Sequence, residues 1–183
     1  MNIPAQYQWL LELHTLPKTT SLALKELGVT EVVGKGSNKT IIAWRDELNQ
    51  AGVKISGYSD DSIPWCGLFA AIIALRRMGA ASEVVSEPLW ARNWAKYGTK
   101  ADKACLGDIL VFVRNGGGHV GFYVGEDKTC YHVLGGNQSD KVCFTRIEKG
   151  RCIAVRRPPY KVQPDMVKPF LLSPKGAISS NEA

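Results

Sequence analysis

The stretch "DDSIPWCGLFAAIIALRRMG" at residues 60–79 places a cysteine, Cys66, at the start of an otherwise apolar predicted helix. A thiol in the first turn of a helix lies beside backbone N–H groups without intrahelical partners and beside the positive end of the helix dipole. Both favour the thiolate, the nucleophilic form. Pro64 suits a first turn, and the segment 60–62 supplies side chains that can cap it. The alternative is that Cys66 is a small core residue among the apolar residues that follow it.

A cysteine nucleophile needs an imidazole within hydrogen-bond reach, and the chain has three histidines, His14, His119 and His132. His14 lies among leucines in the first predicted helix, which favours a structural role. His119 opens "HVGFYVG", where strand alternation places it on one face with Gly121 and Tyr123. The three glycines before it leave space for another backbone beside the imidazole, although they also suit a flexible hairpin turn. His119 is therefore the candidate base for the cysteine.

A third residue must accept a hydrogen bond from the imidazole and orient it, and two candidates follow in the sequence. Asn137 in "LGGNQSD" stands two positions beyond Gly135, so alternation places both on one face, from which His132 in "TCYHVL" is turned away. We favour Asn137 and keep His132 as the alternative, because a single β-bulge would swap the faces. Each also has a structural interpretation, Asn137 as a turn residue beside glycines and His132 as an exposed strand residue.

Hydrophobic periodicity predicts the elements that hold these residues. Apolar residues recur at helical spacing over residues 4–16, 19–32 and 39–52, and again after Cys66. From about residue 106 the period changes to two, as in β-strands. The β-rich runs are residues 107–114, 119–125, 129–134, 141–147 and 152–157. Helices followed by an antiparallel meander predict an α+β domain.

The length of 183 residues, with 45% hydrophobic residues, suits one core rather than two full domains. We predict a single domain over residues 1–157, with residues 1–20 as an N-terminal helical extension. A proline-rich tail over residues 158–183 is expected to wrap the surface and then fray. The sequence contains no run of about 18 apolar residues, so no membrane span is predicted. The N-terminus lacks a secretory signal pattern, so the protein is expected to be synthesised in the cytoplasm and exported, if at all, by another route.

The formal charge of +6 and the pI near 9.1 favour polyanionic surroundings such as nucleic acid, anionic lipid or bacterial cell wall. The basic residues are scattered, with short pairs at residues 76–77 and 156–157. The sequence has no stripe of basic residues interleaved with aromatic residues, the pattern that would suggest nucleic-acid recognition. Nucleic acid is therefore not an expected partner.

The five cysteines contain no CxxC pair, which argues against a structural zinc site, and their odd number leaves at least one thiol free. If the last three strands form successive hairpins, Cys130 lies opposite about residue 145 and Cys152 opposite about residue 146. Neither then faces Cys143. We interpret Cys105, Cys130, Cys143 and Cys152 as mostly small buried apolar residues, with disulfides as the alternative.

The segments "PWCGLFAAIIALRRMG", "GDILVFV", "GGHVGFYVG", "VLGGNQSDKV" and "VRRPP" resemble the NlpC and CHAP branches of the papain-like cysteine peptidases. The resemblance is greatest to a subgroup found in phage lysis enzymes and bacterial wall-degrading effectors, and it spans about residues 21–158. It implies a fold with N-terminal helices packed on a central antiparallel sheet. It also implies that Cys66 at a helix N-terminus is the nucleophile and that His119 is the general base.

The same resemblance leaves the third residue open. His132 resembles the strand histidine of the NlpC branch, whereas Asn137 resembles the asparagine of the CHAP Glu-x-Asn block, whose glutamate is replaced here by Gly135. One motif also departs from the family. Most NlpC-type enzymes have Asp-Cys-Ser-Gly at the nucleophile, and this chain has Trp-Cys-Gly-Leu at residues 65–68.

The implied function is a peptidoglycan hydrolase that cleaves an amide bond of the cell-wall peptide, as an endopeptidase or an amidase, without metal or cofactor. Trp65, Tyr123 and Gln138 flank the expected site and are candidate substrate contacts, although core positions suit Trp65 and Tyr123 equally well. The scissile bond stays open among the D-Glu to diaminopimelate link, a cross-bridge and the muramoyl-L-alanine amide.

The expected biological setting follows from the same resemblance. A monomer would act on the stem peptide in the periplasm or cell wall, as a phage lysin with holin-dependent release or as an antibacterial effector with a cognate immunity protein. Two alternatives are a non-catalytic wall-binding or phage structural module of the same fold, and a papain-like hydrolase or transferase that acts on a host protein.

Overall fold

The computed structural model describes residues 3–180 and residue 182. Helices precede the sheet along the chain, which confirms the predicted α+β class. The α-helices are α1 (Lys18–Lys25), α2 (Lys39–Gln50) and α3 (Cys66–Met78), and the 3₁₀ helices are η1 (Ala5–Glu12), η2 (Ala81–Glu83), η3 (Ala91–Lys96) and η4 (Lys149–Arg151). The strands are β1 (Thr99–Lys100), β2 (Ile109–Arg114), β3 (Gly117–Glu126), β4 (Cys130–Gly135), β5 (Cys143–Glu148) and β6 (Cys152–Arg157).

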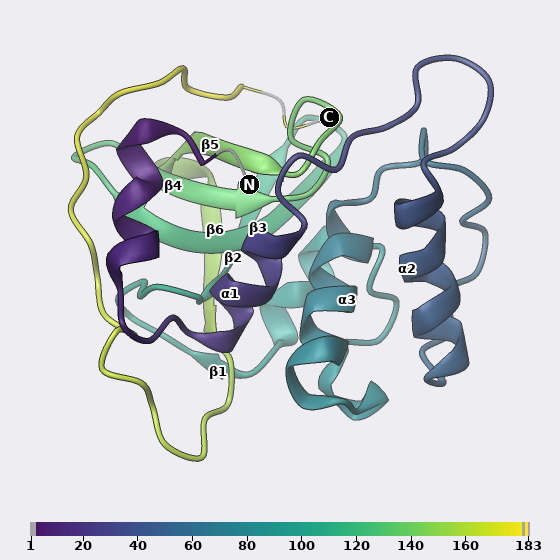
Figure 1. The fold of residues 1–183 in the computed structure, drawn as a ribbon, viewed down its shortest axis with the longest axis horizontal. Helices are drawn as coiled ribbons and strands as arrows, with labels where there is room; N and C mark the ends of the chain where they lie inside the picture. The colour runs from purple at the N-terminus through teal and green to yellow at the C-terminus, as the bar shows by residue number, and fades with distance from the viewer. Residues whose placement is uncertain (1–2, 181, 183) are drawn as a thin grey trace.

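Helix α3 occupies the centre of the molecule. It packs on strand β3, on α1 and on α2, and α2 forms the outermost layer on that side (Figure 1). Every side chain from Cys66 to Leu75 is buried, which is typical of a helix covered on all sides. The helix ends at Gly79, which adopts the left-handed conformation with φ 76° and donates its N–H to the carbonyl of Leu75.

The start of α3 differs from the prediction that acidic residues before it act as caps. Trp65 is the N-cap residue and its side chain makes no capping bond. The carboxylate of Asp61 accepts the backbone N–H groups of Val32 and Asn38, and Asp60 bonds to neighbouring serines. Asp61 therefore ties together two loops, and the first N–H groups of α3 are left for other partners.

The N-terminal segment is less regular than its periodicity predicted. It forms the 3₁₀ helix η1, which ends at Glu12, so His14 lies beyond it on an exposed bend. Among residues 3–180 and 182, no helix combines the length and the apolar character needed to cross a membrane.

The strands form one six-stranded antiparallel sheet in the order β1-β6-β2-β3-β4-β5. Strands β2 to β5 form the predicted meander, but β6 returns to lie between β1 and β2, so the expected β5–β6 hairpin is wrong. Cys152 consequently lies opposite Phe112, and in the β4–β5 hairpin Cys130 lies opposite Glu148 rather than residue 145. All five cysteines are free thiols; of the four interpreted as small buried residues, Cys105 and Cys130 are buried, whereas Cys143 and Cys152 are half-buried.

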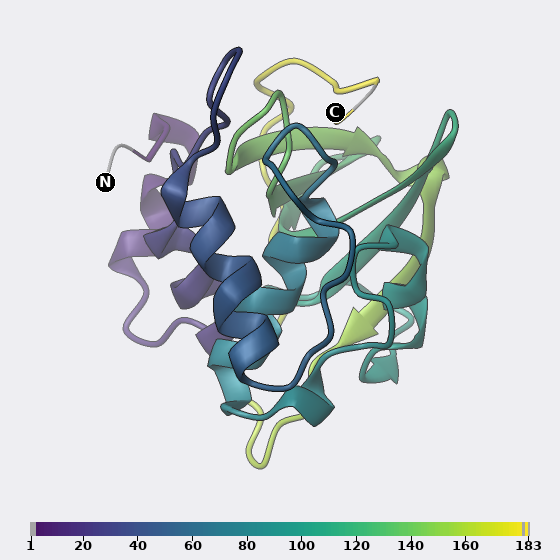
Figure 2. The same cartoon turned by 90° about the vertical axis from the view of Figure 1, so that its right-hand side faces the viewer.

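The sheet must curl, because only η4 connects β5 to β6. Three strands lie between them in the sheet order. Four strand spacings in a flat sheet would span about 19 Å, whereas the four residue steps from Glu148 to Cys152 reach about 14 Å at most. Figure 2 shows the resulting curved sheet.

The curl gives the sheet a buried core on each face. The face toward the helices contributes Val120, Phe122 and Val124 to the main core, as alternation in β3 predicted. The opposite face encloses a smaller cluster that includes Phe112 and Tyr123. His119 shares the strand face of Tyr123, so it approaches the site from the inner face of the curled sheet.

The C-terminal tail runs around the outside of the sheet and returns toward its upper end (Figures 1 and 2). Ser179 donates its backbone N–H to the carbonyl of Arg146 at the edge strand β5. Further along, the Glu182 carboxylate is 1% exposed and forms an ion pair of 2.6 Å with Arg151. The expectation of a frayed end is wrong for the described part of the tail.

Candidate active site

Cys66 is the first residue of α3, and its thiol lies where the helix start meets strand β3. The backbone N–H of Val120 lies close enough to favour the thiolate, as do the N–H groups of Cys66 itself and of Gly67 in the first helical turn. The predicted placement of the cysteine at a helix N-terminus is therefore present in the structure. The sulfur lies beside the residue that follows His119 in β3.

The ionisation of Cys66 differs from the prediction. Burial raises the pKa of the thiol, and the Val120 N–H, the Arg114 charge and the helix N–H groups oppose this shift without offsetting it. The side chain is only 4% exposed, so loss of hydration outweighs the helix dipole. In the resting structure Cys66 is a neutral thiol rather than the expected thiolate.

His119 lies near the start of β3, opposite Phe112 in the β2–β3 ladder, and is 1% exposed. Burial lowers the pKa of the imidazole to about 4, while Glu182 and the bond to Gln138 act in the opposite direction. The ring is therefore neutral near pH 7. Among the described residues no hydrogen bond joins the Cys66 thiol to the His119 ring, and the thiol lies at the backbone N–H of Val120, the residue that follows His119. Such bonds often form only when substrate is bound.

Gln138 orients the imidazole. Its Oε1 accepts a hydrogen bond of 3.1 Å from the Nε2–H of His119. The amide orientation follows from its other contacts, because Nε2 of Gln138 donates to the carbonyls of Cys143 and Val133. The oxygen must then face the ring, which places the imidazole proton on Nε2. The Nδ1 lone pair of His119 is therefore available to accept a proton.

Asn137, the favoured third residue, makes no hydrogen bond to His119. Strand β4 ends at Gly135, and Asn137 adopts a left-handed conformation with φ 57° in the turn that follows. Strand alternation therefore stops before Asn137, and the turn brings the next residue, Gln138, to the ring. The Asn137 side chain is buried, and its Oδ1 has no partner among the described residues.

The alternative third residue, His132, lies in a separate polar network. Its Nδ1 pairs with the hydroxyl of Tyr7 at 2.8 Å, and its Nε2 pairs with the carboxylate of Asp127 at 3.0 Å. Asp127 also forms an ion pair of 2.8 Å with Arg146. His132 is fully buried rather than exposed, and it links η1 to the turn between β3 and β4. Of Asn137, His132 and Gln138, only Gln138 hydrogen-bonds the His119 ring.

The three predicted substrate contacts are all buried. Trp65 donates its indole N–H to Glu31 and packs near Trp44, and Tyr123 donates its hydroxyl to Glu126 inside the curled sheet. Gln138 belongs to the site, but it contacts the imidazole instead of open solvent. None of the three presents a free surface to a ligand in the resting structure.

Two glycines allow the close packing at this site. A methyl group on Gly135 would lie 2.8 Å from Oε1 of Gln138 and 3.3 Å from Nε2 of His119. On Gly136 it would lie 2.6 Å from the side chain of Phe69 in α3. The "GG" before Asn137 therefore lets the β4–β5 turn pack closely against both the imidazole and the nucleophile helix. No cluster of three or more potential metal ligands occurs among the described residues.

No protein-family model matches the chain, and no curated protein matches it either.

The sequence predicts Gln138 as a substrate contact because it flanks the expected site, and in the structure its side chain hydrogen-bonds the His119 ring. The left-handed backbone at Asn137, Ser139 and Asp140 reverses the chain within a few residues, which strand periodicity does not predict. The cluster "NQSD" is rich in residues that tolerate this conformation, so a tight turn that redirects Gln138 was the available clue.

Proposed function

We propose that this protein is a cysteine-dependent amide hydrolase in which Cys66 is the nucleophile, His119 the general base and Gln138 the residue that orients the base. The observation that carries the proposal is the His119–Gln138 hydrogen bond, which directs the unprotonated Nδ1 away from Gln138 while the Cys66 thiol lies beside the same strand. Nucleophile, base and orienting group are the three parts that acyl transfer by a thiol requires.

The first half of the reaction begins from the neutral pair. Nδ1 of His119 takes the thiol proton as the Cys66 sulfur bonds to the substrate carbonyl carbon. The carbonyl oxygen becomes an oxyanion, and the N–H groups at the start of α3 stabilise it. The imidazolium then gives its proton to the leaving amine as the carbon–nitrogen bond breaks, which leaves an acyl group on the sulfur.

The second half regenerates the protein. A water molecule gives one proton to Nδ1 of His119 while its oxygen attacks the thioester carbonyl. The carbon–sulfur bond breaks, the acid product leaves, and the proton returns to the thiolate of Cys66. Because the thiol is 4% exposed, a substrate carbonyl reaches the sulfur only when neighbouring segments move aside.

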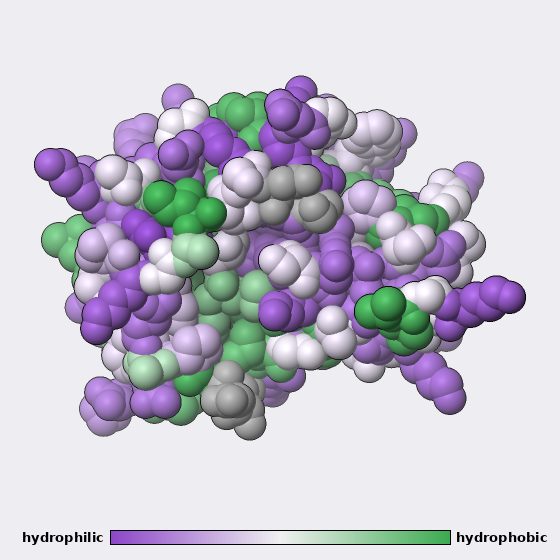
Figure 3. Space-filling model, turned by 90° about the horizontal axis from the view of Figure 1, so that it is seen from above, coloured by the Kyte–Doolittle hydropathy of each residue, from purple (hydrophilic) through white to green (hydrophobic). Residues whose placement is uncertain are grey.

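We propose peptidoglycan peptides as the substrate and an NlpC/CHAP-like papain fold as the architecture. The sequence resemblance supports both, as does the arrangement of a central nucleophile helix on an antiparallel sheet. The net charge of +6 favours an anionic wall polymer. Figure 3 shows a largely hydrophilic face, with a few separate apolar groups, on the side where the tail returns. Such a face suits contact with a hydrated polymer.

The test is incubation of purified protein with muropeptides and with an unrelated unfolded protein, followed by mass spectrometry. Hydrolysis of one amide bond in the muropeptides alone is the expected result, and Cys66→Ala should abolish it with an unchanged circular dichroism spectrum. Cleavage of the unrelated protein would favour a protein-directed hydrolase. Binding of muropeptides with no cleavage would favour the non-catalytic module.

A further inference from the structure

The segment from Pro88 to Arg92 packs against both α3 and β3, the elements that carry Cys66 and His119. The carbonyl oxygens of Pro88 and Leu89 lie so close to Gly67, the residue after the nucleophile, that a methyl group there would be 2.2 and 2.7 Å from them. At its other end, the guanidinium of Arg92 donates to the carbonyl of Gly117, two residues before His119, at 2.7 and 3.1 Å. The segment therefore contacts both the start of α3 and the start of β3.

This segment is held firmly. The side-chain amide of Asn93 donates to the carbonyls of Ser86 and Glu87, and the indole of Trp94 donates to the carbonyl of Pro88. Glu87 adopts a left-handed conformation with φ 49°, a strained backbone for a non-glycine residue that persists only where the surroundings fix it. A side chain presented from this segment is therefore preorganised.

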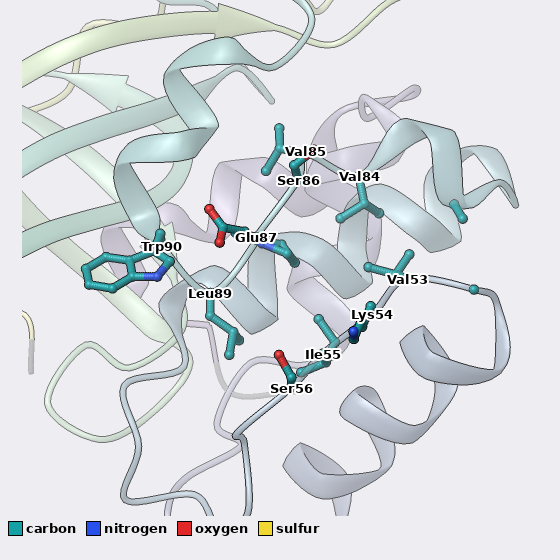
Figure 4. A pocket seen from close by; sticks show the side chains of 13 residues that line it. Val53, Lys54, Ile55, Ser56, Val84, Val85, Ser86, Glu87, Leu89 and Trp90 are labelled. Atoms are coloured by element: carbon teal, nitrogen blue, oxygen red, sulfur yellow. The ribbon is translucent and has the colours of Figure 1, made fainter.

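The side chain presented is Trp90, which is 68% exposed and stacks on no other aromatic ring among the described residues. Trp90 lines the end of the neighbouring hollow that Leu89 and Ile55 also line, and in Figure 4 its indole points away from their side chains. Trp90 also borders a shelf of about 250 Å³. The shelf is lined by Trp90, Ala91, Arg92, Gly116, Gly117 and Gly118.

The shelf matches one class of ligand. Its lining combines the flat indole of Trp90 with glycine backbone and the side chain of Arg92, so an aromatic ring, peptide groups and a guanidinium border one shelf. A pyranose ring has the complementary form, with C–H groups on its face and hydroxyl and acetamido groups around its rim. The shelf is also of a size to hold one such ring. An isolated peptide side chain would need neither the flat plane nor the polar edge.

We infer that Trp90 and the 116–118 turn bind an N-acetylated sugar ring of the glycan strand whose attached peptide enters the catalytic site. The inference rests on the proposed function, because it assigns the sugar that adjoins the cleaved peptide. It makes Trp90 a specificity residue for glycan-linked over sugar-free peptides.

A binding experiment tests the sugar site without hydrolysis. The Cys66→Ala protein is titrated with tri-N-acetylglucosamine and followed by calorimetry and by Trp fluorescence. Binding is expected to weaken by about tenfold or more when Trp90→Ala is added, as for a buried aromatic anchor, and Trp90→Phe should retain most of the affinity. The matched control is Leu11→Ala, another exposed apolar residue, at 64% exposure, which should bind as the parent does. Absence of binding, or equal binding by the Trp90→Ala protein, overturns the inference.

A kinetic comparison separates this inference from the proposed function. Wild-type and Trp90→Ala proteins are assayed on a muropeptide that carries its sugars and on the same stem peptide without them. The expected result is a loss in kcat/KM on the sugar-bearing substrate alone, mostly through KM. Equal losses on both substrates would overturn the sugar site while leaving the hydrolase proposal intact. Failure of the wild-type protein to cleave either substrate would overturn the hydrolase proposal, and oligosaccharide binding would still decide the sugar site.

Discussion

The Nε2–H of His119 donates to Oε1 of Gln138 over 3.1 Å, and the carbonyls that hold the Gln138 amide leave only that oxygen facing the ring. One side chain therefore fixes both the orientation and the tautomer of the imidazole. The lone pair on Nδ1 is available because of a residue in the turn between β4 and β5.

Replacement of Gln138 tests this relationship. Gln138→Ala should lower kcat by about two to four orders of magnitude, because the imidazole loses its orienting acceptor, with a smaller change in KM. Asn137→Gly keeps the left-handed backbone and removes the neighbouring amide, so it serves as the control and should stay within several-fold of wild type. Steady-state kinetics of both variants on muropeptides make the comparison. Greater damage from Asn137→Gly would restore Asn137 as the third catalytic residue.

The pH dependence follows from the low pKa of His119. Burial lowers this pKa to about 4 in the folded protein, against about 6.5 in an unfolded chain. Between these values the unfolded state binds more protons, so the contribution of His119 to stability is full above pH 6.5 and falls as the pH drops to 4. Activity should likewise persist to pH 5 with an acid limb near 4, measured as kcat/KM against pH.

The variant His119→Gln tests whether His119 causes this pH dependence of stability. His119→Gln cannot gain the proton, so its unfolding free energy should lose less between pH 6.5 and 4 than that of wild type. Parallel curves for the two proteins in denaturant titrations would contradict the assignment of the low pKa to His119.

The Glu182 carboxylate is expected to act on the same imidazole. It favours the protonated ring, and it is held beside the site by the ion pair with Arg151. Glu182→Gln should therefore lower the pKa of His119 further, which an NMR titration of the ring protons would detect. Glu12→Gln, at an exposed position of η1, is the control. An unchanged or raised His119 pKa in Glu182→Gln would show that the tail does not influence the ring.

Gly67 should be intolerant of a side chain. A methyl group there would lie 2.2 Å from the carbonyl oxygen of Pro88, so Gly67→Ala must displace the segment that presents Trp90 or the start of α3. We expect a loss of about 1 to 3 kcal/mol in unfolding free energy, together with reduced turnover. Gly150→Ala is the matched control, because no heavy atom lies within 4 Å of its added methyl group. Equal stability of the two variants would contradict the contact.

The buried network around Asp127 should contribute to stability rather than to catalysis. Its carboxylate accepts bonds from Arg146 and His132 and from two backbone N–H groups, and although burial opposes it, these donors hold the pKa of Asp127 well below its usual range. Asp127→Ala leaves two buried polar partners behind and should cost about 3 to 5 kcal/mol. Thermal unfolding against Asp102→Asn, an exposed carboxylate, checks this. A small stability loss with a large activity loss would place the network in the catalytic site.

The sequence predicted those features of the site that depend on regular elements. Cys66 at a helix start and His119 on the inner strand face follow from helical and strand periodicity, which short local contacts impose. Gln138 lies beyond the end of β4, where a left-handed residue decides the direction of the chain. The resting ionisation of Cys66 depends on burial by distant segments, and no local pattern contains that information.

Local sequence patterns could not predict the place of β6 in the sheet either. Its residues alternate as those of β5 do, and either strand could pair with several neighbours. The curl of the sheet and the partner of β1 decide the outcome, and both are properties of the whole chain.

The late place of β6 in the chain also affects how this protein is made. Strand β1 pairs only with β6 in the sheet. Residues 99–100 therefore have no strand partner until residues 156–157 have been synthesised. Contacts that span such a distance in sequence form slowly, and during synthesis the chain emerges from its N-terminus at about 5 to 20 residues per second. Cys66 therefore leaves the ribosome long before the curled sheet that holds His119 can close. The hydrolase activity that we propose, if it is assembled in this order, is expected to stay silent on the nascent chain and to appear only when the sheet has closed.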